Sequence, residues 1–83
     1  MRTEPLPHLS TFVCAAERGS FTAAARELGV SQAAVSQRVQ SLESLLRTQL
    51  FRRAGGRVTL TDAGRQLHDY AIRILDLTAE AWG

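Results

Sequence analysis

The stretch GSFTAAARELGVSQAAVSQRVQSLESLL, residues 19–46, decides the fold of this 83-residue chain. It predicts two helices joined by a short turn. The first, Thr22–Leu28, contains three consecutive alanines, whose small side chains let another helix approach closely. Gly29 permits a backbone conformation that other residues resist, and Ser31 is a suitable N-cap for a second helix over about 32–46. Two helices joined in this way form a helix-turn-helix.

The outer face of the helix predicted over 32–46 differs from an ordinary solvent-exposed face. Projected at about 100° per residue, one side of this helix is apolar and the opposite side is small and polar, without an acid. The opposite side carries Ala33, Ser36, Gln37, Gln40 and Ser44. Because amides both donate and accept hydrogen bonds, this face is typical of a helix that reads base edges in DNA. A merely polar surface is the alternative.

The segments on either side complete a small domain. Apolar residues at helical spacing predict a helix over about 7–18. Downstream, 50–53 and 57–60 are candidate strands, and Ala54-Gly55-Gly56 between them is a hairpin turn signal. We therefore expect a mainly α fold: a winged helix-turn-helix of three helices plus a two-stranded β wing over residues 1–60.

Residues 61–83 predict a long dimerisation or linker helix, capped by Thr61. Its apolar positions alternate in spacing between four and three, which is a heptad seam. The seam consists of Ala63, Leu67, Tyr70, Ile74, Leu77 and Ala81. A second edge of Gly64, Ala71 and Leu75 can rest on the domain. Because a helix of this length is about 30 Å long, the domain cannot cover all of it, and we expect the seam to pair with a second copy.

The net charge of +2 is unevenly distributed. All ten basic residues are Arg, against eight acids. Residues 31–60 hold five arginines and one glutamate, a net of +4, whereas 61–83 hold two arginines and four acids, a net of −2. No acid lies between Arg47 and Arg57, the stretch that also contains Arg52 and Arg53. Such a basic stretch suggests a polyanion partner, with a solvated loop as the alternative.

Several function classes have no support in the sequence. There are no paired carboxylates, phosphate-binding loop or activated nucleophile, so we expect no enzyme. The single Cys14 excludes an internal disulfide and is best interpreted as a small buried hydrophobe, while His8 and His68 are isolated, so no metal site is expected. Apolar runs are only a few residues long, too short to span a membrane.

The motifs together resemble a known family. They are Gly19-Ser20-Phe21-Thr22-Ala23-Ala24-Ala25, Leu28-Gly29-Val30-Ser31-Gln32, Val35-Ser36, Leu42-Glu43, Leu50-Phe51 and Leu60-Thr61-Asp62-Ala63-Gly64. The chain is similar to the N-terminal DNA-binding domain of LysR-type transcriptional regulators over about residues 6–80. The resemblance implies sequence-specific binding of double-stranded DNA by a homodimer, at an operator with two-fold half-sites.

The resemblance also implies roles for individual residues. With Gln40 added from the outer face, the expected base-reading residues are Gln32, Ala33, Ser36, Gln37 and Gln40. The expected contacts with the DNA backbone or minor groove are Ser20, Thr22 and Arg53, to which we add Ser31, Arg38, Arg52 and Arg57. The expected dimer interface is the heptad seam.

Further expectations concern the whole regulator. Family members carry a C-terminal domain that binds a small-molecule inducer, and they usually form tetramers. We expect this chain to be an N-terminal part without that domain, to need no cofactor itself, and to act in the bacterial cytoplasm at the nucleoid. The alternative function is a dimerisation or protein-interaction module with a vestigial winged helix.

Departures from the family pattern lead to specific expectations. Ala33 stands where Pro is common, and Gln37-Arg38 where Arg-Gln is common, so the exposed amide favours adenine over guanine. Arg38 projects toward the edge of the core face, where a contact with Glu27 or Glu43 competes with a phosphate contact. Arg47 replaces a helix-ending Gly, so we expect a looser or longer helix end.

Overall fold

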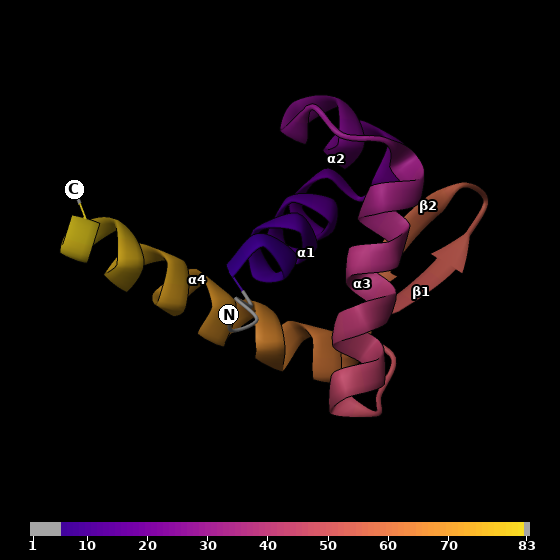
Figure 1. Ribbon diagram of the computed structural model, residues 1–83. Coiled ribbons are helices and arrows are strands. Elements are labelled where there is room, and N and C mark those ends of the chain that lie inside the picture. The colour runs from indigo at the N-terminus through magenta and orange to yellow at the C-terminus, as the bar shows by residue number, and fades with distance from the viewer. Residues whose placement is uncertain (1–5, 83) are drawn as a thin grey trace.

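The computed structural model describes residues 6–82, which form four helices and one hairpin (Figure 1). The elements are α1 (Leu6–Arg18), α2 (Phe21–Leu28), α3 (Gln32–Leu46), β1 (Phe51–Ala54), β2 (Arg57–Leu60) and α4 (Asp62–Trp82). The predicted fold class, a mainly α winged helix-turn-helix followed by a long helix, is confirmed. The predicted starts of α1 and α2 were each one residue too late.

Ser20 caps the start of α2, and Gly29 and Ser31 form the turn between α2 and α3. The Ser20 hydroxyl accepts a hydrogen bond from the backbone N–H of Ala23 at 3.0 Å, and the Ser31 hydroxyl accepts one from Ala34 at 3.0 Å. Each bond satisfies a donor that the first turn of a helix leaves free. Gly29 has φ +70°, the left-handed conformation that ends α2. The turn therefore has the geometry that its residue types predict.

Aromatic side chains join the helices to the wing. The Phe51 ring lies 5.4 Å, centroid to centroid, from both Phe12 of α1 and Phe21 of α2. Val35 of α3 is fully buried against the same cluster, and so is Ala24, whose small side chain allows α2 and the rest of the core to approach closely. The core thus lies where α1, α2, α3 and β1 meet.

The hairpin is antiparallel, with Phe51 paired to Leu60 and Ala54 paired to Arg57. Gly55 and Gly56 both have positive φ, +59° and +78°, which a two-residue turn of this handedness requires. Within β2, the Val58 N–H donates to the carbonyl of Gly19 at 3.1 Å, and the Val58 side chain is buried. The wing is therefore tied to the connection between α1 and α2.

The end of α3 corrects one expectation from the sequence. The helix stops at Leu46, and Arg47 itself takes the left-handed conformation, with φ +55° and ψ +43°. Its conformation costs a non-glycine residue about 1–2 kcal/mol. Hydrogen bonds around it offset that cost: Thr48 N–H donates to the Glu43 carbonyl at 3.1 Å, and the Glu43 carboxylate accepts from Leu50 N–H at 2.8 Å. The helix therefore does not continue further, and it ends in a hydrogen-bonded left-handed cap formed by Arg47.

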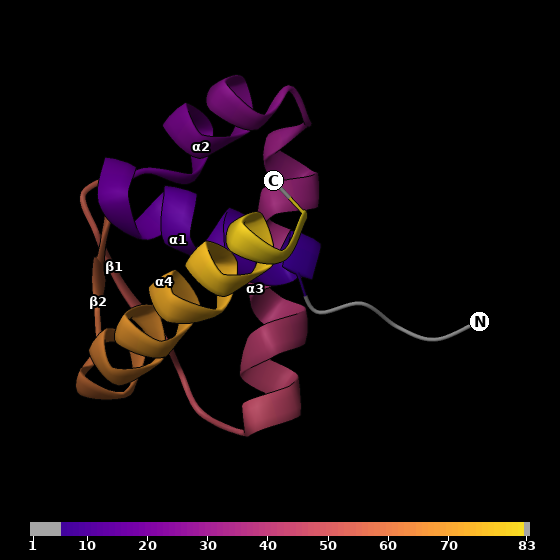
Figure 2. The same cartoon turned by 90° about the vertical axis from the view of Figure 1, so that its left-hand side faces the viewer.

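The last helix, α4, begins in contact with the hairpin and extends past α1 (Figure 2). Its predicted inner edge is confirmed, because Gly64 and Ala71 are buried and Leu75 packs against the core. The residues of the heptad seam differ in burial. Leu67 also packs against the core, whereas Tyr70 and Leu77 are 60% and 63% exposed. Towards its C-terminal end, α4 therefore carries an apolar strip that the described domain does not cover.

Gly64 provides a stability test, because a Cβ at this position would lie 2.2 Å from the Leu50 carbonyl oxygen. That carbonyl is held in place by the Thr61 N–H at 3.0 Å. We expect Gly64→Ala to lower the free energy of unfolding by about 1–3 kcal/mol, although alanine is the better helix former. Urea unfolding at fixed protein concentration measures the change.

Ala79→Gly, at an exposed position of the same helix, is the matched control and measures helix propensity alone. A Gly64→Ala variant as stable as the original chain, or more stable, would show that α4 does not press on this carbonyl.

Candidate nucleic-acid interface

The outer face of α3 presents the predicted polar residues to solvent. Ser36 is half-buried, and the others are exposed: Gln32, Ala33, Gln37 and Gln40. The opposite side of α3 is buried in the core, as predicted. The acid of this helix, Glu43, is half-buried and engaged with the Leu50 N–H. The exposed face of α3 is consequently free of negative charge.

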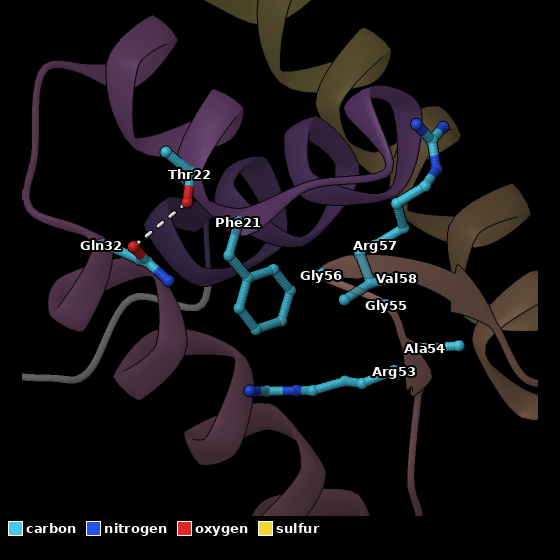
Figure 3. Close-up of a pocket in the computed structure, with 9 residues that line it drawn as sticks. All are labelled: Phe21, Thr22, Gln32, Arg53, Ala54, Gly55, Gly56, Arg57 and Val58. Atoms are coloured by element: carbon cyan, nitrogen blue, oxygen red, sulfur yellow. Dashed lines mark hydrogen bonds between the residues drawn. The ribbon is translucent and has the colours of Figure 1, made fainter.

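A cleft of about 260 Å³ separates the start of α2 and α3 from the wing (Figure 3). The buried Phe21 ring lies in it, and the tip of the hairpin forms one wall. On the opposite wall, the Thr22 hydroxyl donates a hydrogen bond to Oε1 of Gln32 at 3.1 Å. The cleft therefore brings together residues that the sequence assigned separately to base reading and to backbone contact.

Arg53 is held in this cleft by an aromatic ring. Its guanidinium carbon lies 4.7 Å from the centroid of Phe21, a cation–π contact. Figure 3 shows the side chain extending from the wing toward α3. The sequence indicated Arg53 from its place in a basic hairpin but missed Phe21, whose supporting role depends on a contact 32 positions away in the chain.

The other wing arginines point elsewhere. Arg57 turns away from Phe21 in Figure 3, and its guanidinium lies near Gly19, where an added Cβ would be 3.5 Å from Nη2. Arg52 lines a second groove together with Gln40 and Gln49, between α3 and β1. The wing thus offers positive charge in several directions rather than one cluster.

Arg38 has a different partner from the two that the sequence suggested. Its Nη1 donates to the Thr11 hydroxyl at 3.0 Å, and that hydroxyl donates to the Pro7 carbonyl at 2.8 Å. The suggested partners are engaged elsewhere, since Glu27 pairs with Arg18 and Glu43 caps the Leu50 N–H. Of the two alternatives that the sequence left open, the structure shows a contact within the domain, and its partner is a buried threonine that the helix packing brings close rather than Glu27 or Glu43.

The charge of the wing region is not neutralised within the described structure. Over residues 6–82, no carboxylate forms an ion pair with Arg47, Arg52, Arg53 or Arg57. Guanidinium groups left open in this way can form forked hydrogen bonds with phosphate. The positive charges of these four arginines are therefore available at the surface.

Other kinds of site are not supported in the same part of the chain. Among the described residues, no group of three His, Cys, Asp or Glu side chains could hold a metal ion. No helix in this range is long and apolar enough to cross a membrane. Cys14 is buried as predicted, and its burial, with Glu27 close by, raises the pKa of the thiol and keeps it protonated.

Comparison with known proteins identifies the family to which this chain belongs. The family model described as "Bacterial regulatory helix-turn-helix protein, lysR family" matches residues 6–65, well over half of the chain. The chain belongs to the LysR family. The members of this family are transcriptional regulators, and the part matched is their DNA-binding helix-turn-helix.

Known LysR-family regulators are similar in sequence to most of this chain. It is 47% identical to the regulator PtxR of Pseudomonas aeruginosa over 70 residues, and 42% identical to CfxR of Cupriavidus necator over 81 residues. These matches cover 84% and 98% of the chain but only 22% and 26% of the relatives. A crystal structure of the CbnR DNA-binding domain with DNA superposes with a TM-score of 0.89 at 35% identity, covering 95% of this chain and 90% of that one.

Proposed function

We propose that this LysR-type domain binds double-stranded DNA sequence-specifically as a homodimer, at an operator with two half-sites. The observation that carries the proposal is the acid-free amide and hydroxyl face of α3 beside a basic wing whose Arg53 is held over Phe21. A helix of this kind fits the major groove, where amides read base edges. The solved complex of the similar CbnR DNA-binding domain with DNA supports DNA binding by this chain.

Base reading is assigned to the outer face of α3, by Gln32, Ala33, Ser36, Gln37 and Gln40. Gln37 and Gln40 are exposed with both ends of the amide open to a ligand, because neither forms a side-chain hydrogen bond among the described residues. An amide of this kind pairs well with adenine, to which it can donate and from which it can accept. Gln37, where the family often carries Arg, is the residue whose identity most affects sequence preference.

Contacts with the backbone or minor groove are assigned to the helix caps and the wing. They are Ser20, Thr22, Ser31, Arg38, Arg52, Arg53 and Arg57. Ser20 and Ser31 each accept one N–H bond at a helix start and keep a hydroxyl proton to donate to a phosphate. Arg38 is the weakest member of the set, because Thr11 already engages its guanidinium.

Dimerisation is assigned to α4. Tyr70, Ile74, Leu77 and Ala81 are exposed along one side of the helix, and Trp82 beside its end is 87% exposed. Ala63 and Leu67 lie at the end of the seam nearest the domain, where Leu67 is also part of the core. An apolar strip of this size on a small domain is typical of an interaction surface, and a second α4 is the complementary partner.

A DNA titration tests the function as a whole. We expect the affinity for an operator selected from a random pool to fall steeply with salt, by about a thousandfold between about 50 and 200 mM for six phosphate contacts per dimer. We also expect clear preference over scrambled duplexes. Fluorescence anisotropy measures both. Equal affinity for every sequence would exclude sequence-specific binding, and the absence of binding to any duplex at low salt would support the alternative of a protein-interaction module.

A pair of variants separates base reading from backbone contact. Gln37→Ala should reduce discrimination at one base pair by roughly 1–3 kcal/mol, whereas Arg53→Ala should weaken binding to all sequences alike. Competition binding with single-base-pair operator variants measures the two patterns. If both variants changed the same base preference, the division of roles between α3 and the wing would be incorrect.

A charge placed on the seam tests dimerisation. Ile74, which is 40% exposed, becomes buried if two α4 helices pair, so Ile74→Glu should produce monomers and lower the affinity for a two-half-site operator. Analytical ultracentrifugation measures the oligomeric state. Ala79→Glu adds the same charge at an exposed position on the other side of α4 and should leave the dimer intact. A dimer that tolerates both changes would have its interface elsewhere.

A further inference from the structure

One hydrogen bond crosses the helix-turn-helix between two exposed side chains. Thr22 lies in the first turn of α2, and Gln32 is the first residue of α3. The Thr22 hydroxyl donates to Oε1 of Gln32 at 3.1 Å. Because both residues are exposed, the bond contributes little to the core, and its main effect is on the orientation of the Gln32 amide.

That orientation determines which end of the amide remains available. A free glutamine can turn its carbonyl and its NH₂ in either direction, and it reads adenine by using both at once. Here the carbonyl is turned to Thr22, and Figure 3 shows the nitrogen directed the other way, toward Phe21 and Arg53. The NH₂ end of Gln32 therefore keeps both of its donors open, whereas one of the two acceptor positions of its carbonyl is occupied by Thr22.

We propose that Thr22 is a positioning residue that orients Gln32 so that it mainly donates a hydrogen bond to its base, and so sets the sequence preference at one operator position. A donor can form a hydrogen bond with the acceptors that guanine and thymine present in the major groove. It cannot form one with cytosine, which presents a donor there. Adenine keeps its N7 acceptor, but its second bond depends on a glutamine carbonyl that Thr22 already engages. The inference rests on the proposed function and replaces the phosphate contact assigned there to Thr22, because the single hydroxyl proton of Thr22 is already donated to Gln32.

The test begins by locating the base pair that Gln32 reads. Operators are selected from a random DNA pool with the unaltered chain and with Gln32→Ala, and the position is the one whose preference Gln32→Ala removes. Dissociation constants are then measured for all four base pairs at that position. The proteins are the unaltered chain, Thr22→Val, Thr22→Ser, and Thr22→Val combined with Gln32→Ala. Valine keeps the shape of threonine without the hydroxyl, and serine keeps the hydroxyl.

We expect Thr22→Val to free the Gln32 carbonyl and to shift the preference toward adenine by roughly tenfold, the size of one well-placed base contact. Thr22→Ser should retain the original preference, and Thr22→Val should have no effect on that preference when Gln32 is alanine. Thermal unfolding by circular dichroism should be similar in all variants, since Thr22 is exposed.

Other results would overturn the inference in distinguishable ways. A uniform loss of affinity in Thr22→Val with an unchanged base preference would make Thr22 a phosphate contact. A change in Thr22→Ser as large as in Thr22→Val, or a change that persists without Gln32, would also exclude the positioning role. If the unaltered chain itself preferred no sequence, the proposed function would fail together with the inference.

Discussion

The contact of Phe51 with Phe12 and Phe21 is the interaction on which the arrangement of this domain depends. Each pair of rings is 5.4 Å apart, so one aromatic side chain of the first strand is fixed against both α1 and α2. Offset and edge-on aromatic pairs of this kind contribute beyond the area that they bury. Because Phe51 opens β1, the position of the whole wing relative to the helix-turn-helix follows from this contact.

The same cluster links the core to the DNA-facing surface. Phe21 contacts Phe51 through one edge, and the Arg53 guanidinium lies over its ring at 4.7 Å. An arginine restrained in this way loses less conformational entropy on binding a phosphate than a free one. A packing interaction inside the domain therefore prepares a charged group outside it, which is how a small core supports a site built from long, mobile side chains.

Polar bonds define the remaining geometry of the surface. Ser20 and Ser31 cap the two helices, and the Thr22 hydroxyl joins them through Gln32. Arg47 takes a left-handed conformation that its residue type disfavours, and the bonds of Glu43 to Thr48 and Leu50 hold it there. The chain thus turns from α3 toward the wing through a left-handed residue that is not a glycine.

The sequence by itself determined the order of the elements, the Ser31 cap, the two-glycine turn of the wing and the division of α3 into a buried and an exposed side. These features depend on residues close together in the chain, whose spacing and backbone preferences are readable without a structure. The tertiary structure alone decided the partners of individual side chains. It directed Arg38 to Thr11 rather than to an acid, separated Arg57 from Arg53, and placed Leu67 partly in the core. Such contacts join residues distant in the chain, and they depend on how the helices and the wing pack in three dimensions.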